Sequence, residues 1–317
     1  MKVRWFPVYA WTVLVYNVGV ILWGAYVRAT GSGAGCGSHW PLCDGTIVPR
    51  SPRVETLVEF SHRLSSGLAL ILVVILAVWA FRAYAKGHPV RTGAALSMVF
   101  IITEALVGAG LVLFELVEDN ASVTRAVSTS VHLINTFLLL AALTLTAWWA
   151  RNGTPINIRR QDVRVWVLGL GFLAMLVLGI SGAVTALGDT LLPPESLEEG
   201  LRQDVDPSMH FMIRLRAIHP LIAVATSLYL LFIVGLPDIV GDARDSKRLA
   251  RAVAVVLVAQ LVAGVVNVLL LAPVWMQMLH LLIADLSWIL LVLLAASTLA
   301  EREPVLALEE AISPKAI

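Results

Sequence analysis

Four histidines lie near the starts of four apolar stretches, each of which should enter a membrane from the same side: His62, His132, His219 and His280. A polar ring close to hydrocarbon is costly, so such a residue in a transmembrane helix usually serves a function. Imidazoles from two facing helices can ligate one haem iron from both sides. The four histidines therefore predict two bis-histidine haem sites in a helical bundle, and with them redox chemistry.

The same residues also allow a purely structural interpretation. A histidine of this kind can lie at the lipid–water interface or form a hydrogen bond between helices, and for any one of the four taken alone that interpretation fits better. Four histidines at equivalent positions of a repeat favour haem ligation instead.

The composition predicts an all-α integral membrane protein. Of the 317 residues, 58% are hydrophobic and only 14% are charged. Eight apolar runs are long enough to cross a bilayer, at about 8–28, 64–82, 93–115, 128–149, 164–187, 217–236, 251–272 and 276–299. The net charge of +1 and the lack of a basic stripe exclude nucleic acid as a partner.

The distribution of positive charge predicts the orientation in the membrane. Of the 23 Lys and Arg residues, fifteen fall on the side of both termini and eight on the other. Positive loops stay inside, so we expect both termini in the cytoplasm and the histidines about one turn or less from the outer surface. The first apolar run is longer than a signal-peptide core, and no Arg- and Ser-rich presequence precedes it, which favours an uncleaved helix in a prokaryotic plasma membrane.

The sequence predicts a duplicated unit that forms two pseudo-symmetric four-helix bundles, over residues 1–150 and 151–317. Short segments match at nearly constant spacing: Val27–Gly31 with Val184–Gly188 and Glu59/His62 with Arg216/His219, both 157 residues apart, and Glu104 with Gln260 at 156. His132 pairs with His280 at a spacing of 148. In each half the histidines then lie on the second and fourth helices.

Small and cationic residues near the histidines suit a haem. Glycine lets a flat macrocycle approach the backbone, and Gly67, Gly108 and Gly264 are the candidates. Haem propionates need cationic partners, and four arginines fall at the right depth: Arg63, Arg125, Arg214 and Arg216. Each arginine is equally well explained as a solvated loop residue.

The two halves differ at one position next to a predicted haem. Glu59 lies three residues before His62 on the same helical face, whereas the second half has Arg216 there. A carboxylate near a reacting carbon can accept a proton or stabilise a developing cation, so Glu59 is the candidate catalytic residue. The alternative is an i,i+4 ion pair between Glu59 and Arg63 that stabilises the start of the helix.

The first outer loop holds Cys36 and Cys43, the only cysteines in the sequence. Their spacing and the Gly and Pro residues around them suggest a disulfide in an oxidising compartment. The bond can be a structural staple, or the pair can exchange electrons or thiols with a partner. A zinc site is less favoured because the loop offers few ligands besides His39.

Other polar residues stay ambiguous. Glu104 and Asp285 fall inside apolar runs, where a charge costs about 2.5–3.5 kcal/mol on insertion scales. They can belong to a proton path or be paired across helices. His39, His88 and His210 read as ordinary loop residues.

Taken together, these features resemble the haem A synthase family, in the bacterial and archaeal form with a cysteine pair in the first outer loop. The resemblance covers essentially the whole chain and depends on eight helices in two halves, the Cys-x6-Cys loop, and the segment Glu59-Phe-Ser-His62-Arg63. It implies that His132, His219 and His280 are the other three haem ligands.

The resemblance also implies a reaction. The substrate would be haem O, whose methyl at ring position 8 is oxidised to an alcohol and then to the formyl group of haem A. The N-terminal half would bind the substrate and the C-terminal half a resident haem B. The reaction needs an electron acceptor, which the sequence does not identify. The implied surroundings are membrane lipid and haem O synthase (protohaem farnesyltransferase), and association between copies of the chain stays open.

Two other functions compete with this interpretation. A cytochrome b-like quinol oxidoreductase with two haems would share the histidines, but it needs neither Glu59 nor the cysteine loop. A haem transporter would use the repeat as its moving part, but transporters bind near the membrane midplane. The predicted ligands lie near one surface, which disfavours a transporter.

Overall fold

The protein is an all-helical, multi-pass membrane protein, as the sequence predicts. The computed structural model describes residues 3–50, 52–152, 155–156 and 162–300. Within this part, eight helices are long and apolar enough to cross a membrane. They are α1 (Phe6–Ala29), α2 (Val54–Ala83), α3 (Pro89–Leu113), α4 (Val123–Asn152), α5 (Asp162–Leu191), α7 (Phe211–Gly235), α9 (Arg244–Leu269) and α10 (Val274–Leu299). The short elements are η1 (Val3–Trp5), η2 (Ser32–Ala34), α6 (Leu197–Val205) and α8 (Pro237–Val240).

Three of the histidine-bearing helices begin earlier than the apolar runs predict. Helix α2 begins at Val54 rather than near residue 64, α4 at Val123 rather than near 128, and α7 at Phe211 rather than near 217. The predicted starts are wrong because the first turns of these helices carry charged residues. Such residues end a hydropathy run without interrupting the hydrogen bonds of the helix backbone.

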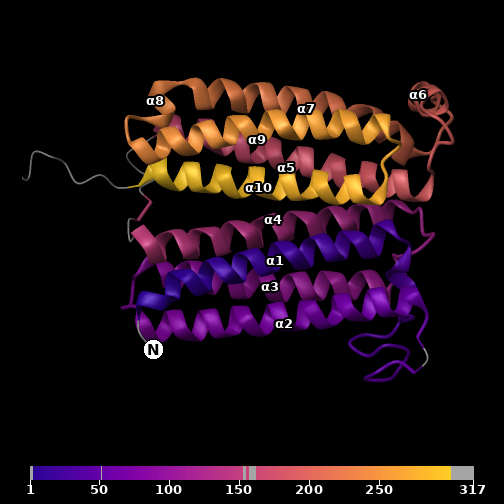
Figure 1. The fold of residues 1–317 in the computed structure, drawn as a ribbon, viewed down its shortest axis with the longest axis horizontal. Helices are drawn as coiled ribbons and strands as arrows, with labels where there is room; N and C mark the ends of the chain where they lie inside the picture. Colours follow the sequence, from indigo (N-terminus) through magenta and orange to yellow (C-terminus); the bar gives the residue numbers. More distant parts are fainter. Residues whose placement is uncertain (1–2, 51, 153–154, 157–161, 301–317) are drawn as a thin grey trace, which may run out of the picture.

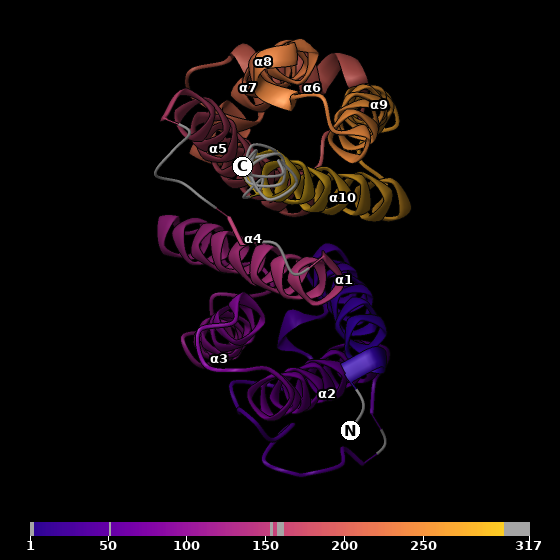
Figure 2. The same cartoon turned by 90° about the vertical axis from the view of Figure 1, so that its left-hand side faces the viewer.

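The eight long helices form two rings of four, which Figure 2 shows end-on. In the first ring, α1 packs against α2 and α4, and α3 packs against the same two helices. In the second ring, α5 and α9 each pack against α7 and α10. The second and fourth helices of each half therefore stand diagonally across their ring, facing its interior.

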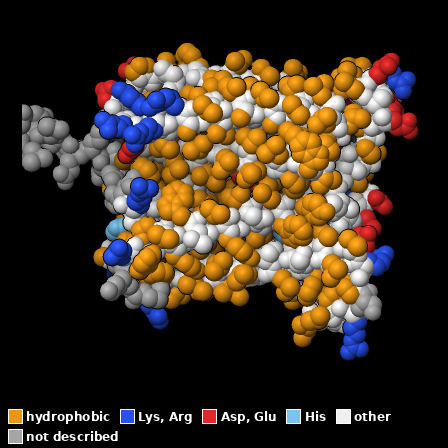
Figure 3. All heavy atoms as spheres, in the orientation of Figure 1, with side chains coloured by type: hydrophobic (Ala, Val, Ile, Leu, Met, Phe, Trp, Pro, Cys, Tyr) orange, Lys and Arg blue, Asp and Glu red, His pale blue; other side chains and the backbone are white. Residues whose placement is uncertain are grey.

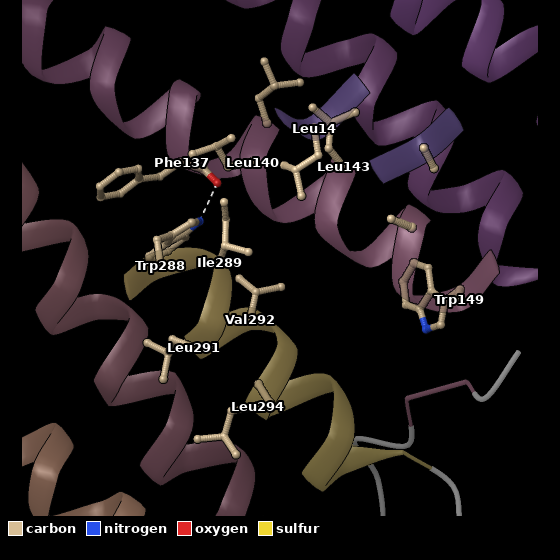
Figure 4. Close-up of a cluster of buried hydrophobic side chains, with 14 of the residues drawn as sticks. Leu14, Phe137, Leu140, Leu143, Trp149, Trp288, Ile289, Leu291, Val292 and Leu294 are labelled. Atoms are coloured by element: carbon tan, nitrogen blue, oxygen red, sulfur yellow. Dashed lines mark hydrogen bonds between the residues drawn. The ribbon is translucent and has the colours of Figure 1, made fainter. Parts of the chain in front are cut away.

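The two rings meet along α4 and α1 of the first and α10 and α5 of the second (Figures 1 and 2). At the centre of this contact the indole N–H of Trp288 donates a hydrogen bond of 2.7 Å to the backbone carbonyl of Phe137 (Figure 4). The aromatic side chains of the same two residues stack with centroids 4.8 Å apart. Leu140, Leu143 and Ile289 are buried beside them. Lipid tails are as apolar as these side chains, so close packing and the indole hydrogen bond hold the rings together.

The two ends of the molecule differ in charge. We call the end where α2, α4, α7 and α10 begin the histidine end (right in Figure 1), and the opposite end, where the N-terminus lies, the terminal end. Described basic residues at the terminal end are Arg4, Arg82, Lys86, Arg91, Arg151, Arg164, Arg244, Lys247, Arg248 and Arg251. Figure 3 shows several basic side chains gathered at this end. Lys2, Arg159, Arg160, Arg302 and Lys315, also assigned to it from the sequence, lie outside the described residues.

Two of the histidines predicted to be ordinary loop residues have a structural role. The Nδ1 atom of His88 accepts a hydrogen bond from the backbone N–H of Val90 at the start of α3, and His210 does the same for Met212 at the start of α7. Both are helix N-caps, which satisfy backbone donors that have no partner within the helix.

Candidate functional site

The four predicted ligand histidines lie inside the two rings, between one and a half and two and a half turns from the start of their helices. His62 is eight residues from the start of α2, His132 nine from the start of α4, His219 eight from the start of α7, and His280 six from the start of α10. At about 1.5 Å per residue these offsets are roughly 9–14 Å along the helix axes. The expectation of one turn or less refers to the outer membrane surface rather than to the helix ends, and it stays a prediction.

The histidines form one pair in each ring. His62 and His132 belong to diagonal helices and are close enough to interact electrostatically, and so are His219 and His280. The side chain of His132 keeps 29% of its surface accessible although it lies within the helices. Two imidazoles that face one interior from opposite helices are the arrangement that a six-coordinate haem iron requires.

A glycine of a neighbouring helix lies against each histidine ring. A Cβ at Gly24 of α1 would come within 2.8 Å of the His62 ring, and one at Gly182 of α5 within 3.0 Å of the His219 ring. A Cβ at Gly108 of α3 would lie 3.7 Å from the His132 ring, and one at Gly264 of α9 would lie 3.3 Å from the His280 ring. Gly108 and Gly264 were expected near a haem. Gly24 and Gly182 were missed, and at Gly67 a Cβ would meet nothing within 4 Å.

Ring nitrogens without protein partners indicate how a haem would fit. The Nδ1 atoms of His62, His132 and His280 are buried and accept or donate no hydrogen bond. A metal-bound imidazole usually presents its second nitrogen to an acceptor that fixes the ring. Glu104 Oε1 lies 3.4 Å from Nδ1 of His132, and Ser181 Oγ lies 2.9 Å from Nδ1 of His219. In the His132 and His219 imidazoles Nε2 is thereby left for iron, whereas Nε2 of His280 lies 3.1 Å from the Gln260 amide. His132 and His219 thus fit a haem as they stand, and His280 fits one once iron replaces Gln260 at Nε2.

Glu104, ambiguous in the sequence, is paired across helices. Besides facing His132, its carboxylate accepts hydrogen bonds of 2.5 Å from Thr136 Oγ1 and from Asn135 Nδ2, both of α4. The equivalent residue of the second half, Gln260, contacts His280 through Nε2 at 3.1 Å. The two halves therefore place an anionic and a neutral residue, respectively, beside the histidine of their fourth helix.

Glu59 is buried and holds the first loop onto α2. One carboxylate oxygen accepts a 2.7 Å hydrogen bond from the backbone N–H of Cys36, and the other pairs with the guanidinium of Arg63. Arg63 in turn donates to the backbone carbonyls of His39 and Leu42, at 2.5 and 2.6 Å. The i,i+4 ion pair considered from the sequence is thus formed, and a catalytic role for Glu59 stays a prediction.

The cysteines of this loop form a disulfide. Cys36 and Cys43 are bonded to each other, and both are almost fully buried, at 0% and 1% exposure. A partner thiol cannot easily reach sulfurs that are covered in this way. The burial favours the structural staple over thiol exchange. Among the described residues, no group of three or more His, Cys, Asp or Glu is placed to hold a metal ion.

The second half carries a different arrangement at the position of Glu59. Arg216 donates 2.8 Å from Nε to Asp204 of α6, and it lies 3.5 Å from Asp189 of α5. Its NH2 group also reaches the carbonyl of Gly200 in α6. In each half, the residue three places before the first histidine thus holds a segment of the histidine end. The anionic Glu59 holds the loop between α1 and α2, and the cationic Arg216 holds α6.

The arginines proposed for haem propionates differ in their availability. The charges of Arg63 and Arg216 are matched by carboxylates, and Arg214 is exposed. Arg125 is only 4% exposed, and its guanidinium donates to the backbone carbonyls of Glu118 and Asn120, which carry no charge. Asp119 also interacts electrostatically with Arg125 but forms no hydrogen bond with it. Among the four arginines, Arg125 is the buried one whose guanidinium hydrogen bonds go only to uncharged groups.

Arg28 was not singled out as a site residue from the sequence. It extends from α1 across to the second ring, where it donates to the carbonyl of Ala186 at 2.6 Å, to Thr190 Oγ1 at 2.9 Å and to Gln277 Oε1 at 2.9 Å. Arg28 and Arg125 interact electrostatically. Arg28 thus joins the two rings at the histidine end. Its only sequence signal was its place inside the repeated segment at residues 27–31.

Asp285 is completely buried in α10, and neither of its carboxylate oxygens has a hydrogen-bond partner among the described residues. The structure therefore does not supply the cross-helix pairing considered from the sequence.

Gly24 provides a direct test of the ring packing. In Gly24→Ala the new Cβ would lie inside the contact distance of the His62 ring and turn it, so haem affinity in the first ring should fall by about 10–100-fold, as for other residues that orient a metal ligand. Titration with haem followed by absorption measures this affinity. Gly19→Ala in the same helix, where a Cβ meets nothing within 4 Å, is the control. Equal affinities of the two variants would contradict this packing argument.

Comparison with known proteins adds a family to this geometry. Residues 7–292 match the model of the family COX15-CtaA, described as cytochrome oxidase assembly protein. A Thermus thermophilus protein named Protoheme IX farnesyltransferase is 56% identical over 291 residues, which are 92% of this chain and 48% of that protein. The chain thus spans about half the length of this relative. Heme A synthase of Exiguobacterium sp. is 33% identical over 171 residues, 54% of each chain, and Heme A synthase of Halalkalibacterium halodurans is 46% identical over 95 residues, 30% of this chain and 32% of that protein.

Proposed function

Because the chain belongs to the COX15-CtaA family of cytochrome oxidase assembly proteins, we propose that it is a haem A synthase, an oxidoreductase that converts the ring methyl of haem O to a formyl group through an alcohol. The observation that carries this proposal is the pair of histidines on diagonal helices in each ring, with the buried Glu59 three residues before the first histidine of the first half and Arg216 at the equivalent place in the second. Two relatives named Heme A synthase support it.

The first ring is proposed as the substrate site. His62 and His132 would hold the iron of haem O, and Glu104 would orient His132 through its Nδ1. Arg125, whose hydrogen-bond partners are neutral carbonyls, would receive a propionate. Glu59 would accept a proton from the reacting side of the ring. Glu104, the other carboxylate that interacts with His62, is already engaged by His132, Thr136 and Asn135.

The second ring is proposed to hold haem B between His219 and His280, with Ser181 fixing the His219 ring. When bound, this haem would pass the electrons of each two-electron oxidation towards an acceptor. The guanidinium of Arg216 is already protonated and cannot accept a proton, and its charge is matched by Asp204 and Asp189. This suits a haem that carries electrons rather than one whose methyl group is oxidised.

The proposed orientation in the membrane depends on the basic residues. The described part carries ten Lys and Arg at the terminal end and eight at the histidine end, namely Arg28, Arg50, Arg53, Arg63, Arg125, Arg202, Arg214 and Arg216. The excess supports a cytoplasmic terminal end and haem sites towards the outer face of a prokaryotic plasma membrane.

The longer Thermus relative bears on the supply of substrate. Its name describes farnesyl transfer to protohaem, and this chain matches 48% of it. We propose that the unmatched part performs the farnesyl transfer, and that the matched part oxidises the product. A haem O synthase would then be the functional neighbour of this chain. The histidine pairs favour this division, since each provides an axial ligand set that transfer to a vinyl group does not need.

The extracted haem distinguishes the proposed function from its rivals. The chain is expressed in a host that makes haem O but no haem A, and the membrane haems are separated by chromatography and identified by absorption. A haem A synthase yields the formyl haem. A chain that leaves only haem B and haem O in this host would be an electron carrier. In a second host that makes no haem O, the appearance of haem O would identify a farnesyltransferase.

A further inference from the structure

The loop between α1 and α2 exposes large apolar side chains at the histidine end. Trp40 and Leu42 are each 41% exposed, Val48 is 66% exposed and Ile47 is 80% exposed. The interior of the loop is occupied by the disulfide, so these side chains have no core of their own to enter. In a loop surrounded by water, four such side chains together would be unfavourable.

The position of the loop indicates what covers this patch. Figures 1 and 2 show the loop projecting sideways beside the beginning of α2, on the side away from α1 and α3. The first half of α2 also exposes apolar side chains, with Val54 71%, Leu57 51% and Leu64 59% exposed. In a membrane protein that surface of α2 faces lipid. The loop patch and the lipid-facing residues of α2 thus lie at the same end of the molecule, on its outward side.

We propose that this loop rests in the phospholipid leaflet at the histidine end, at the boundary between headgroups and acyl chains. Trp40, Ile47 and Val48 would contact the upper acyl chains, and the exposed Arg50 would lie among the phosphates. An aromatic residue, aliphatic side chains and a cation are the composition that places a segment at this boundary.

The loop is fixed to the helix that carries His62. Cys36 donates its backbone N–H to Glu59, and Arg63 holds the carbonyls of His39 and Leu42. A loop held by the leaflet would therefore also hold Glu59 and Arg63 at a constant depth, on either side of the first ligand.

Photocrosslinking tests the proposal on the full chain in liposomes of phosphatidylglycerol and phosphatidylethanolamine. The photoreactive residue p-benzoylphenylalanine replaces Ile47 in one variant, lipid-facing Leu64 of α2 in a second, and Glu198 in a third. Glu198 is the matched control, because it is an exposed residue of α6 at the same end. Phospholipid adducts are measured by mass spectrometry of the digested protein.

The expected result is a phospholipid adduct at position 47 in a yield close to that at position 64, with little or none at position 198. A yield at position 47 as low as that at position 198 would overturn the proposal. An adduct at position 47 with a second copy of the chain in place of lipid would also overturn it.

Discussion

Glu59→Ala is expected to abolish haem A formation while the chain still enters the membrane and binds haem. The carboxylate is 3% exposed and lies one turn before His62 in α2, where we propose that it accepts a proton. General-base catalysis contributes about 10²–10⁴-fold to a rate, so the yield of haem A should fall by at least the lower value. Chromatography of the extracted haems measures it.

Glu59→Gln separates the chemical role of this residue from its structural one. A glutamine can still accept the hydrogen bond from Cys36 and approach Arg63, but it cannot accept a proton. We expect Glu59→Gln to be as inactive as Glu59→Ala, while only the alanine variant loosens the loop, at a cost of about 1–3 kcal/mol for the unsatisfied groups. Glu55→Ala, at an exposed position one turn earlier, is the control. Wild-type haem A yield from Glu59→Gln would refute the proton-accepting role.

His219→Ala and His280→Ala should each remove the haem of the second ring and leave the first ring able to bind haem O. The two histidines lie on diagonal helices, so the loss of either imidazole leaves the iron with one protein ligand. The low-spin absorption of this haem should then disappear. Haem A formation should fall to the background level because the electrons have no route away from the substrate. Reduced-minus-oxidised spectra and haem extraction measure the two effects.

Two controls make these histidine variants interpretable. His210→Ala removes only the N-cap of α7 and should keep both haems, with a loss of about 0.5–2 kcal/mol in stability. His62→Ala and His132→Ala should show the reverse pattern, keeping the haem of the second ring and losing haem O. If both second-ring variants kept the full low-spin spectrum, the assignment of haem to His219 and His280 would be contradicted.

The sequence predicted the parts of this molecule that repeat. Eight apolar runs and the spacing of 157 residues located the helices and paired Glu59 with Arg216 and His62 with His219. The predicted disulfide between Cys36 and Cys43 is confirmed. It was predictable because the sequence has only these two cysteines and both lie in one short loop.

The contacts that cross from one helix to another could not be predicted. The start of α2 was placed ten residues late because charged residues end a hydropathy run. The pairing of Glu104 with His132 and the reach of Arg28 into the second ring depend on helix rotation and neighbour order, which no local pattern encodes. His88 was dismissed as a surface residue because an N-cap is recognisable only once the helix boundary is known.

The haem content of the purified wild-type chain, supplied with haem B and haem O, tests the central claim most directly. Iron and haem are counted against protein, and the spectrum of the oxidised sample reports the ligands. Two haems per chain, both low-spin with two imidazole ligands, are predicted. A single haem per chain, or a second haem held without imidazole, would contradict the account.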